Sequence, residues 1–180
     1  MKNGKRIIVS MTSWLKRIEN VCTVLKSILK QSMMPDLVEL NLSLLEFPDG
    51  TDDLPVDLKT LVNASDIIEI NWEETNDYSF KKIIPVLKKF YGEDYYLVSI
   101  DDDFIYKERY IEKLVTGIEE THADTYNLGN AVIYGNRQIY KSTCFTHDFW
   151  ENLTREVIDT KHDDLYIYYY LCSKNKNMYT

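Results

Sequence analysis

The segment Tyr95–Asp103 constrains the fold of this chain more than any other. Residues 95–100 form a largely apolar run typical of a buried strand, and three carboxylates follow at once: Asp101, Asp102 and Asp103. Neighbouring carboxylates repel one another, and each resists burial unless it is protonated, hydrogen-bonded or bound to a cation. Ligands of open α/β sheets bind beyond the carboxyl ends of strands. The segment therefore predicts a sheet strand with a cation-dependent site at its end.

Oxygen ligands at this density suit Mg²⁺ or Mn²⁺, which keep coordination positions open for the phosphate oxygens of a substrate. Because alternate residues of a strand face the same side, Asp101 and Asp103 can share one ion if the extended backbone continues through them. Asp102 would then point away. A solvated acidic turn after a strand is the alternative interpretation of the same three residues.

Composition places the chain among ordinary soluble globular proteins. It has 180 residues, of which 44% are hydrophobic and 28% charged, which is enough for one domain with a hydrophobic core. The formal charge of −8 argues against nucleic acid as a partner, since phosphate backbones are bound by clustered Lys and Arg. An anionic substrate would therefore need a metal ion or a local basic patch.

Cysteine use and hydropathy predict a cytoplasmic protein. The three cysteines lack metal-type spacing and lie in apolar surroundings, so we expect buried, reduced thiols at Cys22, Cys144 and Cys172. The apolar run 7–9 is too short for the core of a signal peptide. No stretch approaches the ~18 apolar residues of a membrane span, which leaves peripheral association with a membrane-bound assembly open.

Strands and helices alternate over the first two-thirds of the chain. Period-two and apolar runs predict strands at 6–11, 37–42, 66–72 and 95–100, and helical spacing predicts helices at 14–29, 56–62, 80–90 and 110–118. This order predicts an α/β fold with a mainly parallel sheet covered on both faces. The last third differs: we expect short strands at 131–134 and 138–140 joined by a turn at 135–136, a helix capped by Asp148 that runs through Leu153 and Val157, and a Tyr-rich helix over 162–171.

Polar residues at the expected helix starts are candidates for ligand binding. Thr12 and Ser13 precede the helix expected from Trp14, where they would cap it and where free N–H groups suit the polar groups of a nucleotide. Lys81 and Lys82 lie near another expected helix start, which the helix dipole disfavours for cations, so one of them is a candidate for binding an anion. Ordinary solvated lysines are the alternative.

An acidic pair opens the final helix. Asp163 and Asp164 stand directly before the Tyr-rich segment, and either would serve as its N-cap. Capping alone would explain the pair, and so would a role in chemistry. The residues by themselves do not distinguish the two explanations.

Taken together, the order of elements and the three aspartates resemble a small GT-A glycosyltransferase of the family-2-like type, which bacteria use to build surface polysaccharides. The matching motifs, in the order of the family, are 10–14 with 16–18, 47–48 with 53–55, 81–85, 98–103 with Tyr106, and 162–166. The resemblance covers most of the chain. It implies a single GT-A domain over 1–180, with the nucleotide-binding part at about 1–106 and the acceptor side and C-terminal helices at about 107–180.

The resemblance implies that a nucleotide-diphosphate sugar gives its sugar to the hydroxyl of a glycan or lipid-linked acceptor. In such enzymes Mn²⁺ or Mg²⁺ bridges the diphosphate and stabilises the charge that grows on the leaving group. Residue by residue, it makes Asp103 a metal ligand, Asp101 a ligand of the metal or the ribose, and His162 a further member of the metal shell. The substrate-binding residues that it implies are Thr12 and Ser13 near the base or ribose, Lys82 near the diphosphate, Arg17 and Asp102.

In inverting members a late carboxylate deprotonates the acceptor, and Asp163 or Asp164 occupies that place, with Asp163 preferred. The sequence departs from the family at Asn41–Ser43, where an Asp-rich stretch commonly helps to read the base. The chain is also short for the fold. A GT-A-like domain that binds a nucleotide or partner without catalysis is therefore the alternative. Two other enzyme classes fit less well, because this sequence lacks the Thr of a D-x-D-x-T phosphatase and the Gly-rich loop of a sugar nucleotidyltransferase.

Overall fold

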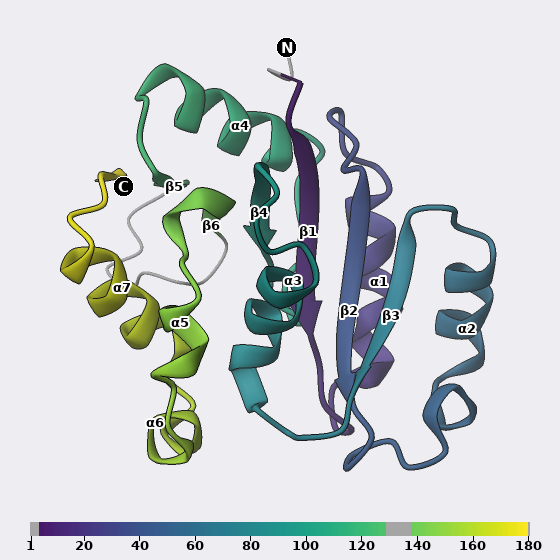
Figure 1. Cartoon of the computed structure of the whole chain (residues 1–180). Coiled ribbons are helices and arrows are strands. Elements are labelled where there is room, and N and C mark those ends of the chain that lie inside the picture. Colours follow the sequence, from purple (N-terminus) through teal and green to yellow (C-terminus); the bar gives the residue numbers. More distant parts are fainter. Residues whose placement is uncertain (1–3, 129–137, 180) are drawn as a thin grey trace.

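The computed structural model describes residues 4–128 and 138–179, and these form a seven-stranded sheet with helices on both faces (Figure 1). The strand order is β3-β2-β1-β4-β6-β5-β7. The strands are β1 Arg6–Thr12, β2 Leu37–Ser43, β3 Ile68–Glu73, β4 Tyr95–Ser99, β5 Thr125–Asn127, β6 Gln138–Lys141 and β7 Met178–Tyr179. The helices are α1 Ile18–Ile28, α2 Val56–Asn63, α3 Ile84–Lys89, α4 Tyr110–Glu120, α5 Asp148–Glu151, α6 Arg155–Thr160 and α7 Asp163–Ser173. Within the described ranges, no helix has the length and apolar character needed to cross a bilayer.

The central strands confirm the expectation of a mainly parallel sheet. Strand β1 pairs in parallel with β2 on one side and β4 on the other, and β2 pairs in parallel with β3. Strand β6 then runs antiparallel to both β4 and β5, and β7 pairs in parallel with β5. The carboxyl ends of β1 to β4 therefore meet at one edge, where the loops after them lie close together.

Two hydrophobic clusters fill the two faces of the sheet. Because side chains alternate along a strand, β1 directs Ile7, Val9 and Met11 into one cluster and Ile8 into the other. The first cluster is closed by α1, α2 and α4, and the second by α3, α5, α6 and α7. Burial on both faces explains why β1 and β4 are nearly continuous apolar runs in the sequence.

The start of α1 differs from the expectation. The helix begins at Ile18 rather than Trp14, and its N-cap residue is Arg17, without a capping bond from its side chain. Thr12 belongs to the end of β1, and the hydroxyl of Ser13 donates a hydrogen bond to Asp102 Oδ2 at 2.7 Å. The prediction that Thr12 or Ser13 caps this helix was therefore wrong, because Thr12 is the last residue of β1 and Ser13 bonds to Asp102 instead.

Two expected helices are interrupted. The segment predicted as one helix over 80–90 is a 3-10 helix, Tyr78–Lys82, followed by α3, because Pro85 has no N–H to donate and is accepted only in a first turn. The helix expected to run from Asp148 through Val157 is split into α5 and α6. Thr154 caps α6 by accepting a hydrogen bond from the Val157 N–H, which requires a break before it.

Caps and small strands also differ. The residue before α5 is His147 and the residue before α7 is His162, so Asp148, Asp163 and Asp164 lie in first turns rather than at N-caps. Strands β5 and β7 were not predicted, since two or three residues carry no periodicity. The expected strand 131–134 and turn 135–136 lie outside the described residues.

The thiols are only partly as expected. Cys22 and Cys144 are free and buried, as predicted, whereas Cys172 is free and exposed. The prediction for Cys172 was wrong because α7 is apolar around most of its circumference, so that its sequence does not reveal which side faces the sheet.

Candidate functional site

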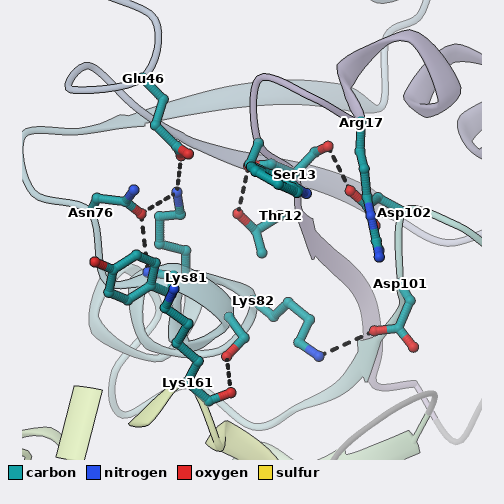
Figure 2. Close-up of a pocket in the computed structure, with 13 residues that line it drawn as sticks. Thr12, Ser13, Arg17, Glu46, Asn76, Lys81, Lys82, Asp101, Asp102 and Lys161 are labelled. Atoms are coloured by element: carbon teal, nitrogen blue, oxygen red, sulfur yellow. Dashed lines mark hydrogen bonds and ion pairs between the residues drawn. The ribbon is translucent and has the colours of Figure 1, made fainter. Parts of the chain in front are cut away.

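A pocket of about 530 Å³ opens at the carboxyl edge of the parallel strands (Figure 2). Its walls come from the segments after β1, β2, β3 and β4, with one residue from the end of α6. This is the position at which open α/β sheets bind ligands. The lining residues are Thr12, Ser13, Trp14, Arg17, Glu46, Asn76, Tyr78, Ser79, Lys81, Lys82, Asp101, Asp102 and Lys161.

The three aspartates do not continue the strand. β4 ends at Ser99, and the chain turns at Asp102 and Asp103, so alternate residues no longer share a face. Asp101 and Asp102 both line the pocket, and Asp103 is exposed beside it. The extended backbone on which the pairing of Asp101 with Asp103 depended is therefore absent from this segment of the structure.

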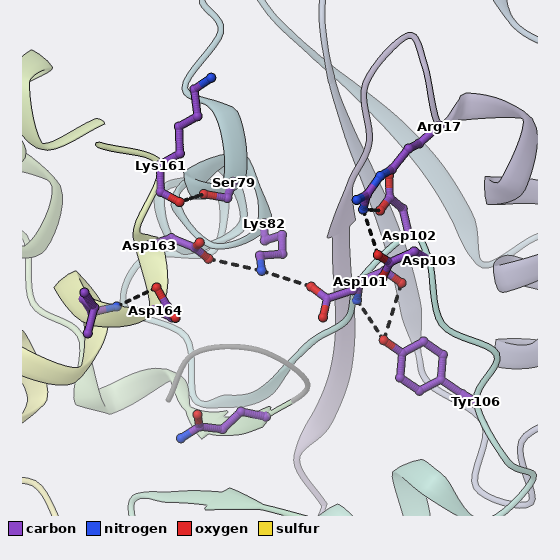
Figure 3. Close-up of polar contacts among 12 residues, drawn as sticks. Arg17, Ser79, Lys82, Asp101, Asp102, Asp103, Tyr106, Lys161, Asp163 and Asp164 are labelled. Carbon is purple, nitrogen blue, oxygen red and sulfur yellow. Dashed lines mark hydrogen bonds and ion pairs between the residues drawn. The ribbon is translucent and has the colours of Figure 1, made fainter. Parts of the chain in front are cut away.

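Arg17 forms ion pairs with Asp102 and Asp103. Its Nη1 atom lies 3.0 Å from Asp102 Oδ1 and 2.9 Å from Asp103 Oδ2 (Figure 3). The hydrogen bond to Asp102 is the largest cause of a raised pKa of the guanidinium. Asp102 is only 6% exposed and also accepts the bond from Ser13. The expectation that Asp102 points away from the site was wrong: its carboxylate ties the segment after β1 to the segment after β4.

Lys82 connects Asp101 to the first turn of α7, which belongs to the helices α5, α6 and α7 that form the C-terminal helical layer. The lysine is 4% exposed, and its Nζ atom lies 3.2 Å from Asp101 Oδ1 and 3.1 Å from Asp163 Oδ2 (Figure 3). Burial lowers the pKa of Lys82, but the carboxylates of Asp163 and Asp101 outweigh it, so that the pKa is raised overall. Lys82 is thus a buried cation at the wall of the pocket rather than a solvated lysine.

Tyr106 fixes the backbone at Asp101. Its hydroxyl accepts a hydrogen bond from the Asp101 N–H at 2.8 Å, and the ring is buried. Tyr106 packs against Tyr110 at the start of α4, with ring centroids 4.6 Å apart. The motif match included Tyr106 without giving it a role, and the structure shows that it orients the start of the acidic turn.

Lys81 brings two further residues into the site that the sequence did not reveal. It is 2% exposed, and Nζ lies 3.1 Å from Glu46 Oε2 and 2.9 Å from Asn76 Oδ1. Glu46 follows β2 and Asn76 follows β3 in turn-rich segments that carry no periodic pattern. Burial is the largest influence on Lys81 and lowers its pKa, against the opposing effect of Glu46.

The two carboxylates of α7 differ in environment. Asp163 is 4% exposed and faces Lys82, whereas Asp164 is partly exposed and its Oδ1 accepts a hydrogen bond from the Leu165 N–H at 2.9 Å. His162, at the N-cap position of the same helix, is exposed. Asp163 therefore carries a structural ion pair, and Asp164 is the more accessible of the two acids.

The donor set fits a divalent ion that is held jointly with a substrate. Across 4–128 and 138–179, no group of three or more His, Cys, Asp or Glu side chains could hold a metal by itself. Mg²⁺ and similar hard cations are usually bound through one or two carboxylates together with substrate phosphates. The side chains of Asp101 and Asp103 are 24% and 52% exposed, so both have carboxylate surface that an ion could reach.

The fold is similar to that of solved glycosyltransferase structures. Over 97% of this chain, it superposes on S. aureus TarS 1–349 in complex with UDP, with a TM-score of 0.60 and 13% identity. It also superposes over 97% of its length on the mannosyltransferase PcManGT from Pyrobaculum calidifontis in complex with GDP-Man and Mn²⁺, with a TM-score of 0.67 and 15% identity. The chain spans 60% and 54% of the lengths of these two proteins. No protein-family model matches it, and no curated protein matches it.

Proposed function

We propose that the protein transfers a sugar from a nucleotide-diphosphate sugar to an acceptor hydroxyl, with a divalent metal ion bound at the acidic turn. The observation that carries this proposal is the pocket at the carboxyl edge of a GT-A sheet, with Asp101 and Asp102 in its wall. TarS and PcManGT, whose folds are similar, were solved with UDP and with GDP-Man and Mn²⁺, which supports a nucleotide-sugar donor.

In this proposal Asp101 and Asp103 would hold the metal from the turn after β4, through the exposed parts of their carboxylates, and the ion would act as a Lewis acid that stabilises negative charge on the departing nucleotide diphosphate. Thr12 and Ser13 contact the ribose or base from the end of β1. Lys82 and Arg17, both cations at the pocket, stabilise the diphosphate oxygens by charge. Asp102 positions Ser13 and Arg17 through its two carboxylate oxygens.

We assign the acceptor base to Asp164 in preference to Asp163. A general base must come within hydrogen-bond reach of the hydroxyl that it deprotonates. The burial of Asp163 and its ion pair with Lys82 support a positioning role for it, and the exposure of Asp164 supports contact with an acceptor. A carboxylate base at this place would give inversion at the sugar.

The finer assignments rest on the motif resemblance. We propose that residues 1–106 bind the nucleotide and 107–180 the acceptor side, within one GT-A domain. The acceptor would be a glycan or lipid-linked intermediate of bacterial surface polysaccharide synthesis, and the reaction would take place in the cytoplasm. His162, exposed at the N-cap position of α7, would be a further ligand of the metal.

The first test measures thermal unfolding with UDP- and GDP-sugars, with and without Mn²⁺. A ligand at about 100 times its Kd stabilises by about 2.7 kcal/mol, which for a chain of this size raises Tm by roughly 5–10 °C. We expect this rise only with metal and nucleotide together, and its loss in Asp101→Ala and Asp103→Ala. Asp94→Ala, which removes an exposed carboxylate paired with Lys5, is the matched control and should keep the rise. No rise with any donor would overturn the proposal.

Turnover separates the enzyme from a non-catalytic binding domain. Release of UDP or GDP from the responsive donor, measured with a panel of acceptors and with water, should fall by 10²–10⁴-fold in Asp164→Asn, while metal-dependent nucleotide binding is kept. Asp159→Asn is the matched control on α6. A wild-type protein that binds donors but releases no nucleotide would favour the binding-domain alternative.

A further inference from the structure

One end of the pocket carries a polar cluster that the proposed chemistry does not use. Lys81, Glu46 and Asn76 lie together on the side of the pocket away from Arg17 and Asp102 (Figure 2). Their side chains come from the 3-10 helix and from the segments after β2 and β3. The Lys81 side chain is 2% exposed and that of Glu46 is 19% exposed, so both charges are largely withdrawn from water.

The bonds within the cluster fix which atoms remain for a ligand. Asn76 Oδ1 accepts from Lys81 Nζ at 2.9 Å and from the Tyr78 N–H at 3.1 Å. Two donors on this atom settle the orientation of the amide, which leaves Asn76 Nδ2 as a donor. Lys81 gives one further N–H to Glu46 Oε2 and keeps a third, and Glu46 keeps Oε1 as an acceptor, within the part of the chain that the structure describes.

Burying a lysine at the wall of a pocket costs desolvation free energy, which the pair with Glu46 only partly offsets. A contact that merely joined two loops would be made as well by apolar side chains of similar volume. The cluster instead presents a cationic donor and an anionic acceptor side by side, about one hydrogen bond apart, toward an open volume. A flat heterocycle with an acceptor next to a donor could form hydrogen bonds with both groups at once.

We propose that Glu46 and Lys81, supported by Asn76, select the nucleobase of the donor, and that they select bases with a carbonyl oxygen next to a ring N–H. The Lys81 ammonium would donate to the carbonyl oxygen and the Glu46 carboxylate would accept from the ring N–H. Uracil has this edge at O4 and N3–H, and guanine has it at O6 and N1–H. This inference rests on the proposed function of the pocket and specifies its substrate class.

The same cluster rejects the two amino bases. Adenine and cytosine present an amino group where Lys81 needs an acceptor, and a bare ring nitrogen where Glu46 needs a donor. Donor would face donor and acceptor would face acceptor, with Lys81 buried and Glu46 partly buried. An unpaired buried polar group weakens binding by about 1–3 kcal/mol, which corresponds to roughly 5- to 150-fold in Kd.

The test is a calorimetric titration of the whole chain, with Mn²⁺, against UDP, GDP, ADP, CDP and inorganic pyrophosphate. We expect UDP or GDP to bind at least tenfold more tightly than ADP and CDP, and the comparison of UDP with GDP identifies which keto base fits. Glu46→Gln should reduce this preference to less than threefold while leaving the Kd of pyrophosphate within twofold. Glu73→Gln, which changes a glutamate at the end of β3 outside the pocket lining, is the matched control and should keep the preference.

Lys81→Met provides a second measurement, and circular dichroism checks that it folds. It should also abolish the preference and leave pyrophosphate binding intact; if it does not fold, the Glu46→Gln result alone decides. Equal affinities for all four nucleotides in the wild type, or a preference that survives Glu46→Gln, would overturn the inference while pyrophosphate binding upholds the proposed function. Binding of neither nucleotides nor pyrophosphate would overturn both.

Discussion

Lys82 Nζ lies 3.1 Å from Asp163 Oδ2, and the side chains of both residues are 5% exposed. The pair joins the 3-10 helix Tyr78–Lys82 to the first turn of α7, two segments separated by about 80 positions in the chain. Lys82 contacts Asp101 as well. One buried cation therefore fixes the C-terminal helical layer against the acidic turn at the pocket.

Replacing Lys82 by Met should destabilise the protein by about 3–5 kcal/mol, because the buried carboxylate of Asp163 loses its partner. The double variant Lys82→Met/Asp163→Asn should recover part of this loss, since no buried charge then remains at α7. Urea unfolding at pH 7 measures the difference. Lys5→Met removes an exposed pair and should change stability by only about 0–1 kcal/mol. If Lys82→Met and Lys5→Met lowered the stability equally, a buried role for Lys82 would be contradicted.

Gly117 in α4 leaves room for the ring of Tyr126 in β5. A Cβ atom built at Gly117 would overlap the Tyr126 ring, which is itself stacked on Tyr179 with centroids 5.5 Å apart. Gly117→Ala should therefore destabilise by about 1–3 kcal/mol through overpacking, even though Ala favours a helix over Gly by about 1 kcal/mol. In a Tyr126→Ala background the clash is absent, so there Gly117→Ala should raise the stability relative to Tyr126→Ala alone, by its gain in helix propensity. Thr116→Ala on the exposed face serves as control, with a change within about 0.5 kcal/mol.

The three thiols should differ in reactivity. Burial raises the pKa of Cys22, and it raises the pKa of Cys144 to about 12, whereas Cys172 is exposed. Since the thiolate is the reacting form, a disulfide reagent should modify about one thiol per folded chain at pH 8 and all three after unfolding. Cys172→Ser should abolish the reaction of the folded protein. Rapid modification of two or more thiols in the native state would contradict the burial of Cys22 or Cys144.

Asp148 should make a pH-dependent contribution to stability. Hydrogen bonds from Lys174 and Thr146 lower its pKa from 3.8 to about 2 in the folded protein. A depressed carboxyl pKa contributes stability that is present above the unfolded pKa and is lost as pH falls through the folded pKa. The stability difference between wild type and Asp148→Asn should therefore be constant from pH 7 to pH 5 and shrink between about pH 4 and pH 2. Urea unfolding at stepped pH tests this, and a difference that stays constant down to pH 3 would exclude the pairing.

Periodic features of the sequence predicted the sheet well. The first four strands, the helices at 56–62 and 110–118 and the position of the acidic turn followed from local pattern, because burial on one or two faces imposes a period of two or 3.6 residues. The break between α5 and α6 was missed, since it depends on a single capping bond to Thr154. Strand β7 has two residues and forms only because β5 already offers an edge.

The structure brings several residues that the sequence singled out to one edge of the sheet, but their contacts did not follow from local pattern. The sequence identified Arg17, Lys82 and the aspartates, yet the pairs Arg17–Asp102 and Lys82–Asp163 join positions about 80 apart, and no local rule specifies which cation meets which carboxylate. Glu46 and Asn76 escaped notice because they lie in turns, where a polar residue is the ordinary case. Long-range ion pairs of this kind require the three-dimensional arrangement of the strand ends.

The alternation of β1 between the two hydrophobic clusters has a consequence for how the protein opens. Loss of either helical layer would strip one face of β1, so neither layer can detach without weakening the strand that also supports the other. The amides of β1 should then exchange with solvent only through global unfolding, while those of α6 exchange through local opening. One central strand thereby makes the two halves of the molecule a single cooperative unit.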